Sequence, residues 1–266
     1  MRPVLFEIAG FPINSYGVSK AVAALLAGYL LAREFRRLGW DPDRAWLLVV
    51  WGTVSGFLGG KLYFLAENLG SLSPHAFGSS GFTWYGGLIA GTLTVVVQAQ
   101  RYGLPLERLA GLVAAPLSLA YGVGRIGCFL SGDGTYGTPS DLPWAMAFPN
   151  GTMPTTVPVH PTALYEAVVA IALGAVLWSL RLRLAPVALF SVYAVVSGVS
   201  RLLVEEVRIN REFLLGLTQP QLWSVLVIAV GVALLVRGAR GRSGRLTSAS
   251  TLDRPHVPAA PGRTHR

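Results

Sequence analysis

Residues 119–137 read LAYGVGRIGCFLSGDGTYG, and this stretch decides what kind of protein the chain forms. It closes a long apolar segment, yet it carries Arg125 among Gly122, Gly124 and Gly127. A guanidinium at membrane depth is costly unless it faces a polar cavity or a bound anion. Glycines at helical spacing let another backbone or a lipid headgroup approach closely. The stretch therefore predicts a membrane helix that ends at a phosphate-holding site.

The composition is that of a membrane protein. Of 266 residues, 52% are hydrophobic and 13% are charged, with a mean hydropathy of +0.52. Soluble domains carry about 25% charged residues, so we expect an integral membrane protein. The net charge of +9 does not indicate a nucleic-acid partner. Most arginines lie in short loops between apolar spans, where the positive-inside rule places them.

The sequence also lacks the marks of several other classes. Cys128 is the single cysteine, which excludes an intramolecular disulfide, and no cluster of Cys and His predicts a metal site. No nucleotide motif is present, so we expect neither a metal nor a cofactor. The first residues, MRPVLFEIAGFPIN, lack the charged start, apolar core and cleavage site of a signal peptide. We therefore expect no cleaved signal peptide.

Seven apolar segments have roughly the 17–25 residues that a bilayer core requires. The fold class that follows is an all-α polytopic membrane protein with about seven transmembrane helices. The predicted spans are approximately 14–32, 45–66, 82–100, 108–130, 162–180, 186–205 and 220–236.

The basic residues predict the orientation of these spans. They gather on one side of a seven-span topology, at Arg33, Arg36, Arg37, Arg44, Arg101, Arg108, Arg181, Arg183, Arg237, Arg240, Arg242 and Arg245. This bias predicts a cytoplasmic C-terminus and an N-terminus outside. We therefore expect a membrane domain over 1–236 with an extracytoplasmic loop over 131–161. A basic cytoplasmic tail over 237–266 is expected to be disordered.

Polar residues that the composition does not explain lie at the predicted outer ends of the spans. Seven helices can bring these ends into one pocket, and ionisable residues inside a membrane indicate a functional site. The residues are Tyr16, Tyr85, Arg125, Asp133, His160, Tyr165, Glu166, Arg201, Glu205 and Arg208.

Structural interpretations stay open beside the functional ones. Arg201 and Glu205 are i,i+4 neighbours that also suit a plain helix-surface pair. Tyr16 and Tyr85 also suit an aromatic belt that anchors span ends. His160, before a proline, also suits a helix cap.

Two further residues inside the spans have an ambiguous role. Cys128 fits a small packing residue better than a nucleophile, because no basic residue adjoins it. Lys61 either extends toward the interface or lines the cavity.

Taken together, several motifs resemble prolipoprotein diacylglyceryl transferase of bacteria over roughly residues 10–236. They are GRIGCF with the acidic, Gly-rich loop after it, HPTALYE, SRLLVEEVR and LTQPQLWSV. The resemblance implies transfer of the diacylglyceryl group of phosphatidylglycerol to the lipobox cysteine thiol of a prolipoprotein, with release of glycerol phosphate. It implies three kinds of partner: phosphatidylglycerol, prolipoprotein signal peptides and membrane lipids. It also implies a multi-pass protein of the bacterial plasma (inner) membrane, with its site toward the extracytoplasmic face.

The resemblance carries roles to particular residues. Arg125 and Arg201 match functional arginines of the family, Glu205 matches its sixth-span glutamate, and Tyr16 matches its first-span tyrosine. We expect Arg125 and Arg201 to hold phosphate, since arginine offers fixed bidentate donors. Glu205 is expected to orient the arginines or the glycerol hydroxyls.

This sequence departs from the family pattern at three positions. Tyr85 stands where the family usually has histidine, before Gly86 and Gly87. Cys128 replaces asparagine, and Asp133 replaces glutamate. The predicted base for the thiol is Tyr85 or, in second place, His160.

The remaining candidate residues are expected to bind substrate. They are Asp133, Gly86 and Gly87, beside Arg125 and Tyr16. The loss of the histidine leaves open a paralogue with another acceptor, or a non-catalytic phospholipid-binding or transport protein. Polar groups at outer span ends, without an internal repeat, favour an interfacial enzyme.

Overall fold

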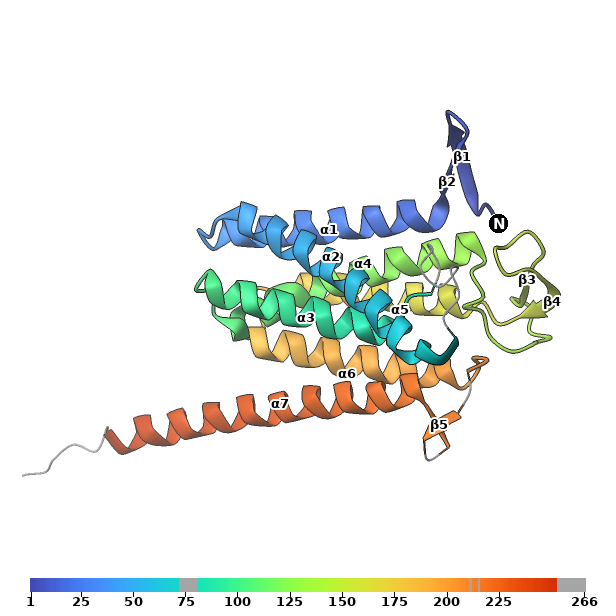
Figure 1. Cartoon of the computed structure of the whole chain (residues 1–266). Helices are drawn as coiled ribbons and strands as arrows, with labels where there is room; N and C mark the ends of the chain where they lie inside the picture. The colour runs from blue at the N-terminus through green and yellow to red at the C-terminus, as the bar shows by residue number, and fades with distance from the viewer. Residues whose placement is uncertain (72–80, 211, 215, 253–266) are drawn as a thin grey trace, which may run out of the picture.

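The computed structural model describes residues 1–71, 81–210, 212–214 and 216–252, and their main feature is a helical bundle (Figure 1). The helices are α1 (Ser15–Arg37), α2 (Pro42–Glu67), α3 (Trp84–Arg101), α4 (Leu106–Ser131), α5 (Thr162–Leu180), α6 (Pro186–Glu205) and α7 (Gln219–Leu252). Each overlaps one predicted span. The predicted all-α polytopic membrane fold is confirmed.

Length and composition distinguish α3 from the other six helices. Within the described residues, six are long and apolar enough to cross a membrane, and α3 is not among them. α3 has 18 residues, and Gln98, Gln100 and Arg101 lower the hydropathy of its last turn. Large apolar side chains point outward, as Leu62 and Leu203 do with 66% and 68% exposure. A bilayer would cover such side chains.

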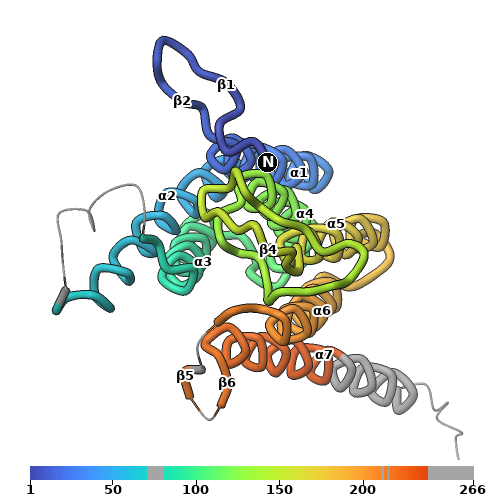
Figure 2. The backbone as a smooth tube through the Cα atoms, turned by 90° about the vertical axis from the view of Figure 1, so that its right-hand side faces the viewer, coloured from blue at the N-terminus to red at the C-terminus, as the bar shows by residue number. Residues whose placement is uncertain are grey.

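Helix α4 lies in the middle of the bundle. It packs against α1, α5 and α6, whereas α2 pairs mainly with α3 and α7 mainly with α6 (Figure 2). The glycines of α4 explain the close packing. A side chain at Gly127 would overlap Ser19 of α1, and one at Gly122 would overlap Ile171 of α5. The close approach that the sequence predicted at these glycines is therefore made by neighbouring helices.

Glycines also set the distance between α2 and α3. A Cβ at Gly86 would overlap the carbonyl oxygen of Gly59, and a Cβ at Gly87 would lie 3.0 Å from the carbonyl oxygen of Gly56. The two backbones therefore touch without intervening side chains. Helix packing accounts for Gly86 and Gly87, and their substrate-binding role stays a prediction.

Three short antiparallel hairpins, which the sequence analysis did not predict, lie at one end of the bundle (Figure 1). They pair β1 (Val4–Ile8) with β2 (Phe11–Asn14), β3 (Met146–Phe148) with β4 (Thr155–Val159), and β5 (Glu212–Leu214) with β6 (Leu217–Thr218). Strands of two to five residues are too short for alternation of apolar and polar side chains to reveal them.

Helix α7 continues to Leu252, beyond the predicted end of the seventh span at 236. The sequence has no proline between Pro220 and Pro255 to break the helix. The structure continues the helix over 237–252, and the disordered tail that the sequence predicted stays a prediction. The rest of the predicted tail, 253–266, lies outside the described residues.

The α2–α3 contact leads to a stability prediction. Gly86→Ala should lower the free energy of unfolding by about 1–3 kcal/mol, because the added methyl group meets backbone atoms that cannot rotate away. Thermal and denaturant unfolding of the detergent-solubilised chain would measure this. Gly17→Ala in α1 is the control, since a Cβ there meets nothing within 4 Å. Equal unfolding free energies for Gly86→Ala and the unchanged chain would contradict the close contact.

Candidate active site

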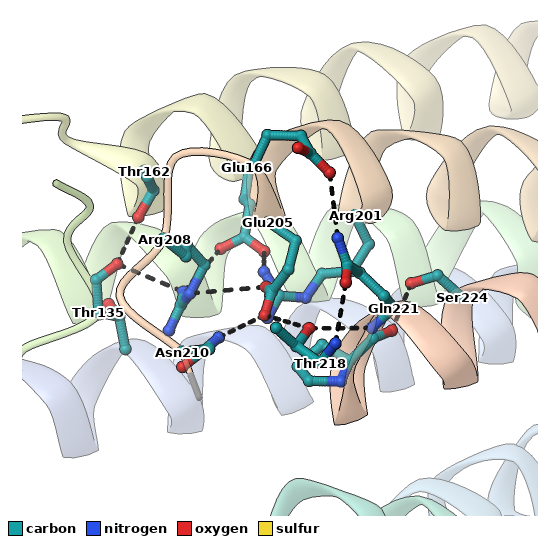
Figure 3. A network of polar contacts seen from close by, with 12 residues as sticks. Thr135, Thr162, Glu166, Arg201, Glu205, Arg208, Asn210, Thr218, Gln221 and Ser224 are labelled. Atoms are coloured by element: carbon teal, nitrogen blue, oxygen red, sulfur yellow. Dashed lines mark hydrogen bonds and ion pairs between the residues drawn. The ribbon is translucent and has the colours of Figure 1, made fainter. Parts of the chain in front are cut away.

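Three helix ends meet where the bundle carries its hairpins, and they gather charged side chains from distant segments (Figure 3). Arg125 lies near the end of α4, Glu166 in the second turn of α5, and Arg201 and Glu205 in the last turns of α6. Helix α5 begins directly after Pro161, which fits a helix start because the N–H that proline lacks would be unpaired there. This start places Glu166 between α4 and α6.

Glu166 is the centre of the cluster and is almost completely buried, with 3% of the residue exposed. Its Oε1 accepts hydrogen bonds from Arg201 Nη1 at 3.1 Å and from the Tyr121 hydroxyl at 2.9 Å. Arg125 pairs with the same carboxylate, since its Nε lies 2.9 Å from Oε2 and its Nη2 lies 3.3 Å from Oε1. One carboxylate therefore ties α4 and α6 to α5.

Glu205 is the second buried carboxylate, and its partners come from beyond its own helix. Arg201 Nη2 lies 2.8 Å from Glu205 Oε2. Asn210 Nδ2 and Thr218 Oγ1 donate hydrogen bonds to Oε1 at 2.6 and 2.7 Å. The pairing of Arg201 with Glu205 is thus part of a buried network, not an isolated pair on a helix surface.

Arg208 joins the cluster from the segment after α6. Its Nη1 lies 3.9 Å from Glu166 Oε2 and donates a hydrogen bond to the Thr135 carbonyl oxygen at 3.3 Å. Its Nε lies 3.9 Å from Glu205 Oε2. Burial, together with repulsion from Arg201, lowers the pKa of Arg208 below the usual range of arginine.

The cluster carries a positive charge in excess. Among the ion pairs of the described residues, the guanidiniums of Arg125, Arg201 and Arg208 pair only with Glu166 and Glu205, which leaves one net positive charge. In the described part of the chain, Arg208 Nε is buried without a hydrogen-bond partner, whereas Glu166 Oε2 and Glu205 Oε2 each lie within 2.9 Å of a guanidinium nitrogen. Buried polar groups normally have partners. The unmet Arg208 donor suits an anionic ligand.

Tyr85 approaches this cluster from α3. Its ring is buried and stacks on Trp223 of α7, with centroids 5.5 Å apart and planes 17° from parallel. Arg201, Glu205 and Arg208 all act electrostatically on its phenol. The sequence prediction that Tyr85 shares a pocket with Arg201 and Glu205 is consistent with this placement.

Tyr16 and Asp133 lie on the Arg125 side. The Tyr16 phenol interacts electrostatically with Cys128, Asp133 and Arg125, and Lys20 Nζ lies 4.9 Å from its ring centroid. With 40% exposure, Tyr16 can meet a ligand that enters from outside the bundle. Asp133 Oδ1 accepts hydrogen bonds from the Thr135 N–H and hydroxyl, so this carboxylate also shapes its own loop.

His160 belongs to a separate group of side chains. Its Nδ1 lies 3.3 Å from the Tyr165 hydroxyl, which also accepts a hydrogen bond from Trp144 Nε1 at 2.8 Å. Among the hydrogen bonds and ion pairs of the described residues, none joins His160 to an arginine of the cluster.

Several partners in the network were not predicted from the sequence. Glu166 and Arg208 were expected only as polar residues without a role, and Tyr121, Asn210 and Thr218 were not identified. Tyr121 precedes Arg125 by one helical turn, a spacing that could have revealed it. Nothing local indicates Thr218, since its partner Glu205 lies across a hairpin.

The fold and this site define a class: a multi-pass helical membrane protein with a buried, net positive arginine–glutamate cluster at one end. The sequence model described as prolipoprotein diacylglyceryl transferase matches residues 3–237. The chain therefore belongs to the prolipoprotein diacylglyceryl transferase family, as its motifs predicted.

Curated relatives agree with this assignment. A Clostridium tetani protein is 32% identical over 239 residues, covering 87% of this chain and 96% of the relative. A Pseudomonas paraeruginosa protein is 32% identical over 250 residues, covering 88% and 92%. A Synechococcus elongatus protein is 30% identical over 259 residues, covering 88% and 86%. All three are named phosphatidylglycerol–prolipoprotein diacylglyceryl transferase.

The geometry predicts a large stability cost for Glu166→Gln. The substitution leaves three largely covered guanidiniums with one carboxylate, and removing one partner of a buried ion pair costs about 3–5 kcal/mol. The control is Asp41→Asn, which removes an ion pair between half-exposed side chains and should cost about 0–1 kcal/mol. Chemical unfolding in detergent would compare them. Equal costs would show that Glu166 does not hold the helix ends together.

Proposed function

We propose that this chain transfers the diacylglyceryl group of phosphatidylglycerol to the thiol of a prolipoprotein cysteine and releases glycerol phosphate. The observation that carries the proposal is the buried cluster of Arg125, Arg201 and Arg208 around Glu166 and Glu205. Its net positive charge suits a phosphodiester, and its family relatives bear the name of this reaction.

The reaction is a substitution at carbon. The acceptor thiolate attacks the glyceryl carbon that carries the phosphate oxygen, so an S–C bond forms and the C–O bond breaks. The electron pair leaves with the phosphate group, and the thiol proton passes to a base. Glycerol phosphate carries one more negative charge than the diester does. A site that stabilises this developing charge accelerates the step.

Arg125 and Arg201 are the phosphate-holding residues of this proposal. Both guanidiniums are held by the buried Glu166, with Nη1 of Arg201 and Nε of Arg125 at 3.1 and 2.9 Å from its oxygens. This pairing fixes their orientation before substrate binds, and preorganised donors need no rearrangement during the reaction. Asp133 and Tyr16 complete the substrate-binding residues near Arg125. Glu205 orients Arg201 and offers an acceptor to the glycerol hydroxyls.

The proposed base is Tyr85. Burial opposes ionisation of its phenol, whereas the nearby charges of Arg201 and Arg208 stabilise the phenolate that forms when the proton leaves. His160 is the alternative, but its partner is Tyr165. Proximity to the arginine cluster therefore favours Tyr85.

The finer cellular assignments belong to the same proposal. The acceptor is the lipobox cysteine of a signal peptide, and membrane lipids surround the six apolar helices. The protein is a multi-pass protein of the bacterial plasma membrane, with its site toward the extracytoplasmic face. The arginine-rich loops at the opposite end of the bundle support this orientation.

The decisive test of function is transfer to a lipobox peptide in phosphatidylglycerol vesicles, with Arg125→Lys beside the unchanged chain. The variant should lose roughly 10²–10³-fold in kcat/KM, because an ammonium keeps the charge but cannot replace the planar pair of donors. Arg101→Lys, at the exposed end of α3, is the matched control and should stay active. No transfer by the unchanged chain would reject the proposed function, and full activity of Arg125→Ala would reject the phosphate assignment.

The same assay separates the two candidate bases. If Tyr85 takes the thiol proton, Tyr85→Phe should slow transfer by roughly 10²–10⁴-fold. Tyr85→His should retain activity with a lower pH optimum, since imidazole titrates near 6.5 and phenol near 10. A His160→Ala variant should then remain active. The opposite pattern, an inactive His160→Ala and a normal Tyr85→Phe, would transfer the role to His160.

Orientation can be tested independently of activity. A reporter inserted near Asn150 should be extracytoplasmic, and a reporter fused after Arg245 should be cytoplasmic, because arginine-rich loops remain on the cytoplasmic side. Paired alkaline phosphatase and green fluorescent protein fusions would measure both positions. A cytoplasmic reporter at Asn150 would place the site on the other face.

A further inference from the structure

A second charged cluster lies at the opposite end of the bundle from the site. The ends of α1 and α5 and the starts of α4 and α6 surround a cavity of about 180 Å³ there. One water molecule needs roughly 10–15 Å³ of such space, so the cavity holds a group much larger than one water. Arg108 lines it, and at 1.5 Å per residue this position is about 25 Å along α4 from Arg125.

A buried carboxylate organises this cavity. Glu34 is 2% exposed and pairs with two arginines that line the cavity. Arg37 Nε donates to Glu34 Oε2 at 2.8 Å, and Arg181 Nε donates to Oε1 at 2.9 Å. Arg181 also stacks over Trp178, 4.0 Å from the ring centroid. Two guanidiniums are therefore held in fixed orientations beside the cavity.

The charges around the cavity do not balance. Arg108 makes no hydrogen bond or ion pair with another described residue, although its guanidinium lies 5.9 Å from the Trp40 ring centroid. Arg33 lies 5.8 Å from the Trp178 ring centroid. Among the charged residues that line the cavity, Arg37, Arg108 and Arg181 stand against the single carboxylate of Glu34, which leaves two positive charges in excess. Such an excess at a cavity favours an anion.

The rest of the lining is apolar and continues toward the lipid-facing surface. Leu112, Leu177 and Leu189 line the cavity, and so does Leu182, which is 62% exposed. A soluble anion gains nothing from these leucines, whereas acyl chains pack on them. Basic pockets between membrane helices are the sites where anionic lipid headgroups bind.

We propose that this cavity binds the phosphate of an anionic glycerophospholipid from the leaflet at this end of the bundle, with acyl chains along Leu182. The site is separate from the proposed transfer site, because it shares none of that site's charged residues and lies in the other leaflet. The lipid bridges α1, α4 and α5, so its binding stabilises the folded bundle.

The test uses the full chain in phosphatidylcholine vesicles that contain a small fraction of photoreactive phosphatidylglycerol, with the reactive group near the glycerol backbone. Irradiation followed by peptide mass mapping should give adducts near Leu112, Trp178 or Leu182, besides any adducts at the hairpin end. Arg108→Gln should reduce these adducts about fivefold, the effect of one basic residue at a membrane surface. Adducts at the hairpin end should not change.

Matched controls make the result specific. Arg101→Gln removes a charge from the same end without lining the cavity and should leave the adducts unchanged. Arg108 is exposed, so Arg108→Gln should unfold at the temperature of the unchanged chain. Should it fail to fold, Arg37→Gln, which is also exposed and lines the cavity, is the second variant with the same expected loss.

Several outcomes would overturn the proposal. Absence of adducts at this end in the unchanged chain would exclude a lipid site. Equal labelling by a photoreactive phosphatidylcholine would show an apolar groove without selection for anions. Complete competition by millimolar inorganic phosphate would assign the cavity to a free anion. An equal loss in Arg101→Gln would show general surface attraction. Adducts at this end without transfer activity would support the lipid site and reject only the proposed function.

Discussion

The carboxylate of Glu166 is the interaction on which the architecture of this protein depends. It is buried inside a helical bundle, where an unpaired charge would be very costly. Arg125 of α4 and Arg201 of α6 both pair with it, so the three helices must lie close enough for these side chains to meet. The glycines of α4 permit that alignment because they let α1 and α5 pack against its backbone. The arginine–glutamate cluster is thus a consequence of how the helices pack.

The two ends of the bundle share one arrangement of charged residues. At each end a glutamate with an almost fully buried side chain holds two arginines, Glu34 with Arg37 and Arg181, and Glu166 with Arg125 and Arg201. Additional arginines then leave a positive excess at each end. Apolar helices separate the two clusters, which suits a protein that meets phospholipid headgroups at both surfaces of a bilayer.

Tyr85 stands where the resemblance implies a histidine, and helix packing holds its ring in place. Gly86 and Gly87 let α3 pack directly against α2, and Tyr85 stacks on Trp223. These contacts set the position of the ring whatever its acid–base character. A phenol at this position sits in the field of Arg201, so the arginine cluster and the base act together in the proposed reaction.

The sequence by itself determined the membrane fold, the positions of the seven helices and the gathering of Arg125, Arg201 and Glu205 at one end. Hydropathy and charge bias depend on neighbouring residues, so they can be read locally. The tertiary structure alone identified Glu166 as the centre, because its arginine partners lie 41 and 35 residues away in the chain. Among the described residues, it also gave His160 a side-chain partner in Tyr165 and placed Gly86 and Gly87 against α2. Contacts between distant segments arise only when helices pack, and no local pattern encodes them.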